Sequence, residues 1–291
     1  MNTTKISDIQ KDGKVHISCE LFPPKTGDKL ANVSEVVKEV AALKPAYMSV
    51  TYGATGGTSD YTVEIAHQVA ELDVPALAHL TCYSSTKEKV HSVVDQLKQT
   101  GIRNILCLRG DAPADPNFAP PNEYKHAADL IYDVKSQGDF CIGGACYPEG
   151  HPEADTIAED IDHLAEKVAA GCDFLTTQMF FDNNIYYNFL YKLLKRGIDV
   201  PVVAGIMPVT NKSSLGRIIS LSGNLVPPRF KAIVERFGND PEAMKQAGIA
   251  YATEQIIDLI ANGVNNVHIY TMNKPDIAQA IMANLSAIYK R

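Results

Sequence analysis

The stretch Lys98–Asp111, KQTGIRNILCLRGD, contains one complete example of the helix, strand and loop pattern that decides the fold. Gly101 stands just past an amphipathic stretch, where glycine often ends a helix because it accepts a left-handed backbone. The apolar run 103–108 follows and has the length of a buried parallel strand. The charged residues Arg109 and Asp111 come directly after this run. The stretch therefore predicts a helix, a strand and then a polar loop.

The same order recurs along the chain. The predicted strands are 16–22, 46–51, 76–81, 103–108, 140–146, 173–179, 201–206 and 266–271. The predicted helices are 29–43, 61–72, 86–99, 123–136, 155–170, 184–196, 211–221, 241–262 and 275–289. Strands that alternate with helices in this way predict an α/β (β/α)8 TIM barrel. A doubly wound sheet is the alternative, but neither G-x-G-x-x-G nor G-x-x-x-x-G-K-[ST] follows a predicted strand.

The predicted domain organisation is one catalytic domain over residues 1–291, with an inserted segment near 222–240. An apolar fraction of 45% and a charged fraction of 21% are typical of a soluble globular protein. The net charge of −7 argues against a nucleic acid or an anionic membrane as partner. The N-terminus has no signal-peptide core, and no run of about 18 apolar residues follows. These features predict a cytoplasmic protein.

The six cysteines form no C-x-x-C pair and lie mostly in apolar runs, where a free cysteine acts as a small hydrophobic residue. They predict neither a disulfide framework nor a zinc site.

Glu20 interrupts the apolar run of the first predicted strand. Because side chains alternate along a strand, Ile17, Cys19 and Leu21 share the face suited to the helix layer, and Glu20 points into the barrel. Pro23 and Pro24 follow, and neither can donate a ladder hydrogen bond. This places the carboxyl group at the carboxyl end of its strand, where barrel enzymes build their active sites.

Polar residues recur at the ends of other predicted strands. Glu20, Thr51, His79, Arg109, Asp111, Tyr147, Gln178 and Tyr270 are expected around one mouth. Taken singly, His79 could be a hydrogen-bonded core residue, and Arg109 with Asp111 a structural ion pair. Their coincidence at six or more strand ends favours a functional site.

The residue types at this mouth narrow the chemistry. No H-x-H or H-E-x-x-H pattern occurs, so no metal site is predicted. No predicted strand interior offers a lysine for a Schiff base. A glutamate in a partly apolar pocket suits general acid catalysis, because burial raises its pKa. Arg109, Tyr147, His151 and Lys167 could bind the anionic groups of a phosphorylated cofactor. The residues alone thus predict a cofactor-binding barrel enzyme with a glutamate acid.

Eight motifs resemble, in order, those of the methylenetetrahydrofolate reductase family. They are CELFPPK, SVTYGATGGT, AHLTC, LCLRGD, YPEGHPEA, TTQMFFD, GIMPVTN and HIYTMNK, and they run from Glu20 to Lys274. The chain ends where the short bacterial form of the family ends, so the regulatory domain of the long eukaryotic form is expected to be absent.

The resemblance implies FAD-dependent reduction of 5,10-methylenetetrahydrofolate to 5-methyltetrahydrofolate, in one-carbon metabolism and methionine biosynthesis. Glu20 matches the general acid that promotes ring opening, Asp111 matches a residue near flavin and folate, and Gln178 matches one that binds the pterin. Tyr270 and Lys274 are further expected substrate contacts. The residues expected to hold FAD are Thr51, His79, Arg109, Gly110, Asp111, Ala145, Tyr147, His151, Asp160 and Lys167.

Two departures from the family bear on the electron donor. Ser214 and Ile218 stand where a glutamine and a phenylalanine contact folate or nicotinamide in the best-studied short form. Lys274 replaces an arginine and keeps the charge. NADH or NADPH is the expected donor, and the alternative is a flavoprotein subunit that receives electrons from a partner protein. The choice of nicotinamide, the physiological direction and a homo-oligomeric state stay open.

Overall fold

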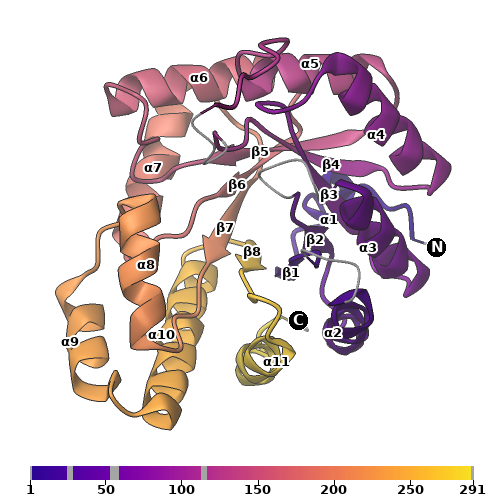
Figure 1. Ribbon diagram of the computed structural model, residues 1–291. Coiled ribbons are helices and arrows are strands. Elements are labelled where there is room, and N and C mark those ends of the chain that lie inside the picture. The colour runs from indigo at the N-terminus through magenta and orange to yellow at the C-terminus, as the bar shows by residue number, and fades with distance from the viewer. Residues whose placement is uncertain (1, 25–28, 53–58, 113–116, 290–291) are drawn as a thin grey trace.

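Eight parallel strands close into one barrel (Figure 1). The computed structural model describes residues 2–24, 29–52, 59–112 and 117–289. Each strand pairs with the next along the chain, and the last returns to pair with the first. The strands are β1 (His16–Leu21), β2 (Met48–Val50), β3 (Ala76–Thr81), β4 (Asn104–Leu108), β5 (Cys141–Cys146), β6 (Phe174–Thr177), β7 (Val202–Ile206) and β8 (Asn266–Ile269). The predicted (β/α)8 fold is confirmed.

Helices surround the strands in Figure 1. They are α1 (Ile6–Ile9), α2 (Leu30–Ala42), α3 (Ser59–Glu71), α4 (Lys87–Gln99), α5 (Ala127–Ser136), α6 (Ile157–Ala169), α7 (Asn183–Arg196), α8 (Lys212–Ser222), α9 (Pro228–Phe237), α10 (Pro241–Ala261) and α11 (Pro275–Asn284). The helix predicted from 123 begins only at Ala127, because the Asp129 carboxylate accepts hydrogen bonds from the backbone N–H groups of Lys125 and His126 and caps the helix there. The helix predicted to 289 ends at Asn284.

The short helix α1 closes the amino end of the barrel, a feature that the sequence pattern did not predict. Ile6 is fully buried and packs on Leu77 and Phe174 inside the barrel. Asn104, at the start of β4, accepts a 2.9 Å hydrogen bond from Ile6 N and donates a 3.0 Å bond to Thr4 O. The amino end is therefore filled, and a ligand can approach the barrel interior only from the carboxyl end.

The middle of the barrel is a packed core. Gly143 in β5 faces Phe174, and a Cβ at this position would lie 2.5 Å from the Phe174 ring and 2.8 Å from Leu106. Interiors pack at crystal-like density, so no larger residue fits here without movement of these neighbours. Outside the strands, Ile17, Cys19 and Leu21 of β1 pack with the helix layer, as alternation predicted.

The segment between β7 and β8 carries α9, which was predicted only as an inserted segment. Phe230 and Val234 of α9 pack on Phe181, Leu215 and Met244 in a smaller core of their own. The Phe230 ring lies 5.2 Å from that of Phe181, centroid to centroid. This cluster attaches α8, α9 and the start of α10 to the carboxyl end of the barrel.

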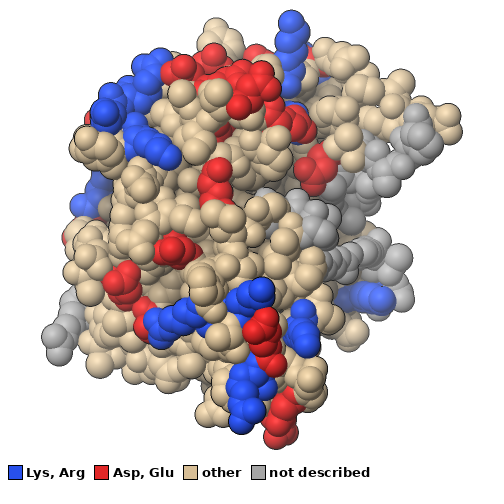
Figure 2. All heavy atoms as spheres, turned by 90° about the vertical axis from the view of Figure 1, so that its left-hand side faces the viewer, with Lys and Arg blue, Asp and Glu red and all other residues tan. Residues whose placement is uncertain are grey.

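The surface is mixed in charge on the side that lies to the left in Figure 1. In Figure 2, Asp and Glu side chains gather near the top of that face, while Lys and Arg side chains occur along its upper left and lower parts. Within the described part of the chain, every helix is too short or too polar to cross a membrane.

Candidate active site

An open cavity of about 380 Å³ lies at the carboxyl ends of β3 to β6, beside the first turn of α5 and the part of α6 from Asp160 to Lys167. Its volume falls in the range of small-molecule sites. The cavity brings together a large share of the residues expected to bind cofactor or substrate: Arg109, Gly110, Asp111, Ala145, Tyr147, His151, Asp160, Lys167 and Gln178.

Five other predicted residues lie beside this cavity rather than in its wall. Glu20 and His79 are buried in the barrel mouth, and Tyr270 lies beyond the end of β8. Thr51 follows β2, and its backbone N–H bonds Leu21 O at 3.0 Å. Lys274 is exposed at the start of α11. Residues 53–58 of the SVTYGATGGT motif lie outside the described residues.

Glu20 and His79 face one another across the mouth without forming a hydrogen bond. Glu20 Oε2 lies 3.9 Å from His79 Nε2, and this buried nitrogen has no hydrogen-bond partner among the described residues. Burial raises the pKa of Glu20 to about 8 and lowers that of His79 to about 3. Desolvation disfavours the charged form of each group. At neutral pH the pair is therefore a protonated carboxyl beside a neutral imidazole.

A fully bonded histidine lies one layer deeper. His268 of β8 bonds Ser18 Oγ at 2.7 Å through Nδ1 and Ser49 Oγ at 3.0 Å through Nε2. Burial, with a smaller contribution from His79, lowers the pKa of His268 to about 3. The phenol of Tyr270 donates a 2.5 Å hydrogen bond to Thr177 O. His268 and Tyr270 are therefore satisfied, whereas the buried His79 Nε2 has no hydrogen-bond partner among the described residues.

Charged side chains in the cavity wall are partly paired. Arg109 forms a bidentate ion pair with Glu153 and lies over the Tyr83 ring at 5.9 Å from its centroid. Lys167 Nζ donates a 2.8 Å hydrogen bond to Ala145 O, and burial lowers the pKa of this lysine. A half-buried cation with a short carbonyl contact keeps two further N–H donors for a ligand.

Asp160 and His151 lie together in this wall. Asp160 is buried, and its pKa is raised by burial even though its carboxylate accepts a 3.2 Å bond from His151 N. Burial lowers the pKa of His151, whose ring meets the Tyr147 ring edge-on at 4.6 Å. The wall thus places a carboxyl group, an imidazole and a phenol beside the two cations.

The sequence patterns missed several cavity residues. His126, the N-cap residue of α5, and His163, in the middle of α6, stack with ring centroids 6.0 Å apart. Thr81, at the end of β3, carries a buried hydroxyl without a hydrogen-bond partner among the described residues. Strand-end position could have indicated Thr81, and the HPEA part of a quoted motif could have indicated Glu153. The histidine pair depends on how α5 and α6 pack against each other, which periodicity does not show.

The two departures from the family pattern lie on α8. Ser214 Oγ bonds the side chain of Asn211, the N-cap residue of that helix, at 2.7 Å. Ile218 is half-buried and packs against the small core around Phe230. Ser214 therefore serves the helix start, and Ile218 contributes to packing.

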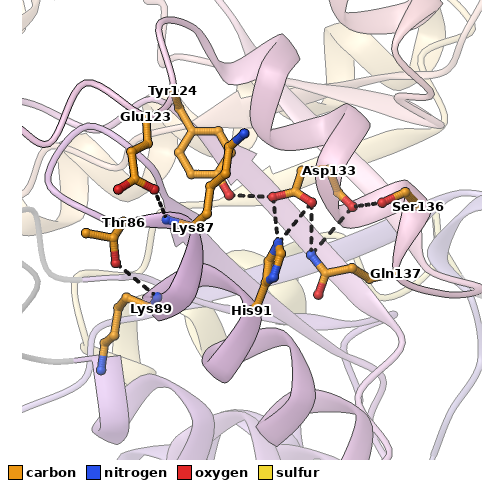
Figure 3. Close-up of polar contacts among 9 residues, drawn as sticks. All are labelled: Thr86, Lys87, Lys89, His91, Glu123, Tyr124, Asp133, Ser136 and Gln137. Atoms are coloured by element: carbon orange, nitrogen blue, oxygen red, sulfur yellow. Dashed lines mark hydrogen bonds and ion pairs between the residues drawn. The ribbon is translucent and has the colours of Figure 1, made fainter.

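A second polar cluster lies outside the cavity, between α4 and α5 (Figure 3). Its members, here called the α4–α5 cluster, are Thr86, Lys87, Lys89, His91, Glu123, Tyr124, Asp133, Ser136 and Gln137. The Asp133 carboxylate bonds His91 Nε2 at 3.0 and 3.1 Å and accepts a 2.5 Å bond from the Tyr124 hydroxyl. Glu123 accepts a 2.6 Å bond from Lys87 N at the start of α4. The cluster holds the connection before α5 against α4. The two ends of this connection, residues 109–111 and His126, line the cavity.

Comparisons with known proteins agree along nearly the whole chain. The family model described as methylenetetrahydrofolate reductase matches residues 5–286. The 5,10-methylenetetrahydrofolate reductase of Pectobacterium carotovorum subsp. carotovorum is 36% identical over 94% of this chain and 91% of its own length. The Escherichia coli (strain K12) protein of the same name is 33% identical over 96% of this chain and 93% of its own.

Two further comparisons extend this group. Methylenetetrahydrofolate reductase (NADH) 1 of Arabidopsis thaliana is 35% identical over 98% of this chain and 50% of its own length. A solved structure of an uncharacterized Clostridium thermocellum protein, which binds two copies of 5-methyl-5,6,7,8-tetrahydrofolic acid, has a TM-score of 0.67 at 16% identity, over 96% of both chains, and supports the fold. Because the family model and relatives above 30% identity both span nearly the whole sequence, this protein belongs to the methylenetetrahydrofolate reductase family.

Proposed function

We propose that this protein reduces 5,10-methylenetetrahydrofolate to 5-methyltetrahydrofolate, with FAD as its cofactor and Glu20 as the general acid. Family membership supports the substrate and the reaction. The observation that carries the acid assignment is the buried Glu20 carboxyl, whose pKa burial raises to about 8. A carboxyl that is still protonated at neutral pH can donate a proton there.

The charges and the helix start in the cavity wall support the proposal of a flavin dinucleotide. Arg109 and Lys167 supply positive charge for a diphosphate, and Ala127 and Ala128 line the cavity at the first turn of α5. Small residues at a helix start leave its free backbone N–H groups open to an anion. The unpartnered Thr81 hydroxyl adds another polar group to the wall. When bound, the flavin would supply the hydride transfer, and the protein supplies binding, orientation and electrostatics.

The expected cofactor residues extend from this cavity toward the barrel mouth. We assign flavin binding to Thr51, His79, Arg109, Gly110, Asp111, Ala145, Tyr147, His151, Asp160 and Lys167. Gly110 has a φ of +84°, and a Cβ at this position would lie 2.9 Å from Thr81 Cβ. Gly110 therefore lets the β4–α5 connection approach β3 closely in the cavity wall.

The substrate would lie over the mouth, between this cavity and β8. Glu20 holds a proton at its carboxyl oxygen, and neutral His79 does not compete as a charged donor. Gln178 lines the cavity at the end of β6, and Tyr270 closes the mouth beyond β8. Lys274 is exposed beside the mouth and can meet a carboxylate tail. Asp111 is exposed at the cavity edge, between the proposed flavin and folate positions.

The electron donor is NADH or NADPH in the first candidate function. In the second, a flavoprotein subunit receives electrons from a partner protein. The residues of α8 support the second candidate, because neither Ser214 nor Ile218 has an aromatic ring that could stack on nicotinamide. Ser214 bonds Asn211, and Ile218 packs against the small core.

Flavin reduction under anaerobic conditions tests both candidates. Purified protein should be yellow, and NADH, NADPH and a neutral reducing dye should be compared side by side for bleaching of the flavin absorbance. Bleaching by a nicotinamide supports the first function. Bleaching by the dye alone supports the partner-dependent subunit. A colourless protein that binds no added FAD would contradict the proposed cofactor.

A further inference from the structure

On the side of β8, the end of β1 has no strand to continue its ladder, whereas on the other side it pairs with β2 as far as Leu21. β1 and β8 are neighbours in the barrel (Figure 1), and their register ends at the pair Cys19 and Ile269. Beyond it, the backbone of Phe22 would be left without a strand partner, just where the acid of the proposed function is attached. Buried backbone groups are nearly always paired, so something else must satisfy them.

A turn after β8 takes over this role. Met272 and Asn273 both have a φ of +54°, a left-handed conformation that is uncommon for residues other than glycine. Asparagine tolerates it better than most residues do. Two such residues in a row fold the chain back toward β1, so the turn 271–274 approaches the end of β1 with side chains instead of backbone.

Those side chains reproduce a strand pairing. Asn273 Oδ1 accepts a 2.8 Å hydrogen bond from Phe22 N, and Asn273 Nδ2 donates a 2.9 Å bond to Phe22 O. The Thr271 hydroxyl donates a 2.5 Å bond to Glu20 O, and Thr271 is buried. One amide thus holds both backbone groups of Phe22, and one hydroxyl holds the carbonyl of Glu20 itself.

We infer that Asn273, assisted by Thr271, is a positioning residue for Glu20: its side-chain amide replaces the missing strand and fixes where the acid carboxyl stands in the mouth. The inference rests on the proposed function, in which Glu20 is the acid. Asn273 itself contacts only the Phe22 backbone in this arrangement, so it acts through β1.

Fixing β1 also keeps the surroundings of Glu20 constant. The groups that face its carboxyl are His79 from β3 and Tyr270 from beyond β8, whose pKa is raised by burial and, secondarily, by Glu20. Without the amide, the end of β1 can move relative to both and admit water. A misplacement of about 1 Å in a catalytic group can slow a reaction by about 10²-fold.

The test compares Asn273→Gly with Asn265→Ala in the FAD-loaded protein. Glycine keeps the left-handed backbone at 273 without strain, so only the amide is lost. Asn265 is half-buried at the opposite end of β8, where its amide donates a 3.4 Å hydrogen bond to Gly13 O, and serves as the matched control. Asn273→Asp is a third variant, which keeps the acceptor for Phe22 N but loses the donor to Phe22 O.

Two readouts separate positioning from mere stability. Steady-state folate reduction gives kcat and KM, and carbon-13 spectra of glutamate-labelled protein follow the Glu20 carboxyl against pH, assigned with Glu20→Gln. Asn273→Gly is expected to lower kcat by roughly ten- to a hundredfold with little change in KM. It should also move the Glu20 titration from about 8 toward its ordinary value of 4.5. Asn273→Asp should not restore kcat, and Asn265→Ala should match the parent.

The outcomes distinguish the two levels of the proposal. If Glu20 of the parent titrates near 8 but Asn273→Gly leaves both kcat and that titration unchanged, the positioning role is wrong and the acid assignment stands. If Glu20 of the parent titrates near 4.5, the acid assignment and the positioning role both fall.

Discussion

Two carboxylate–histidine pairs in this protein show how surroundings decide what such a pair does. At the barrel mouth, Glu20 and His79 lie 3.9 Å apart, both buried and not bonded to each other. In the α4–α5 cluster, Asp133 bonds His91 at 3.0 Å, and the His91 side chain is about half exposed (Figure 3). The residue types are alike, but the supply of hydrogen-bond donors and of water is not.

The pKa values of the two carboxyls move in opposite directions. Burial alone raises that of Glu20 to about 8. Burial also acts to raise that of Asp133, but hydrogen bonds from Tyr124, His91 and Gln137 outweigh it and lower the value below 3.8. A carboxylate that accepts several hydrogen bonds stays ionised and holds neighbouring elements together, whereas a buried carboxyl without donors keeps a proton that it can donate.

The largest expected effect on stability concerns Glu20 and pH. Its folded pKa lies above the unfolded value of 4.5, so the folded state binds the extra proton and stability is lost as pH rises from 4.5 to about 8. Glu20→Gln cannot titrate. Urea unfolding at pH 5, 6, 7 and 8 should show the parent falling relative to the variant by up to about 1.4 kcal/mol per pH unit.

The lowered pKa of His79 makes an opposite contribution, which rises with pH up to about 6.5. Because the parent and Glu20→Gln share this histidine, its contribution cancels in their difference. A difference that does not vary with pH would contradict the buried, neutral state of Glu20.

Asp133→Asn is the corresponding test in the α4–α5 cluster. The change removes the charge that three donors share, so the free energy of unfolding at pH 7 should fall by about 1–3 kcal/mol. The folded pKa of Asp133 lies below 3.8, so its contribution is present above 3.8 and is lost as pH falls through the folded value. Folate reduction by the variant should match the parent at temperatures where both are folded. Equal free energies of unfolding of parent and variant at pH 7 would show that the hydrogen bonds to Asp133 do not stabilise the fold.

Tyr124→Phe removes one donor from Asp133 and leaves His91 in place. The expected loss is about 0.5–1.5 kcal/mol in urea unfolding. Tyr132→Phe, on the exposed face of α5, the helix that carries Asp133, is the matched control and should change stability little because Tyr132 is 71% exposed. If both variants lose the same amount, the bond from Tyr124 to Asp133 contributes nothing of its own.

His91→Gln should have the smallest effect. The His91 side chain is 46% exposed, and ion pairs in contact with water contribute only about 0.2–1 kcal/mol. The loss should shrink further in 1 M salt, which screens exposed charges. A loss that persists unchanged in high salt would indicate a hydrogen bond rather than a charge interaction.

Much of the fold could be predicted from periodicity and punctuation. Runs such as 103–108 between a glycine and a charged loop predict strands of a parallel barrel, and alternation along β1 predicts that Glu20 points inward. The short helix α1 could not be predicted, because four residues give no period and its burial depends on contacts with β4. Helix α9 was not predicted, because the prolines and charged residues in and around it obscure its periodicity.

The candidate site was predictable where it coincides with strand ends, as for Arg109, Tyr147 and Gln178. It was not predictable where two helices meet, as for His126 and His163, since their stacking depends on tertiary packing. Asn273 shows the same limit. The left-handed turn after β8 brings the Asn273 amide to β1, and the local sequence does not indicate that contact.

Stopped-flow measurement of the two half-reactions of Glu20→Gln tests the central claim most directly. Flavin reduction by the electron donor should proceed as in the parent, because no folate takes part in this half-reaction and the proposed acid protonates only the folate. Reoxidation of the reduced flavin by methylenetetrahydrofolate should slow by about 10²–10⁴-fold, the usual range for a general acid. Near-normal reoxidation by folate in this variant would contradict the assignment of Glu20 as the acid.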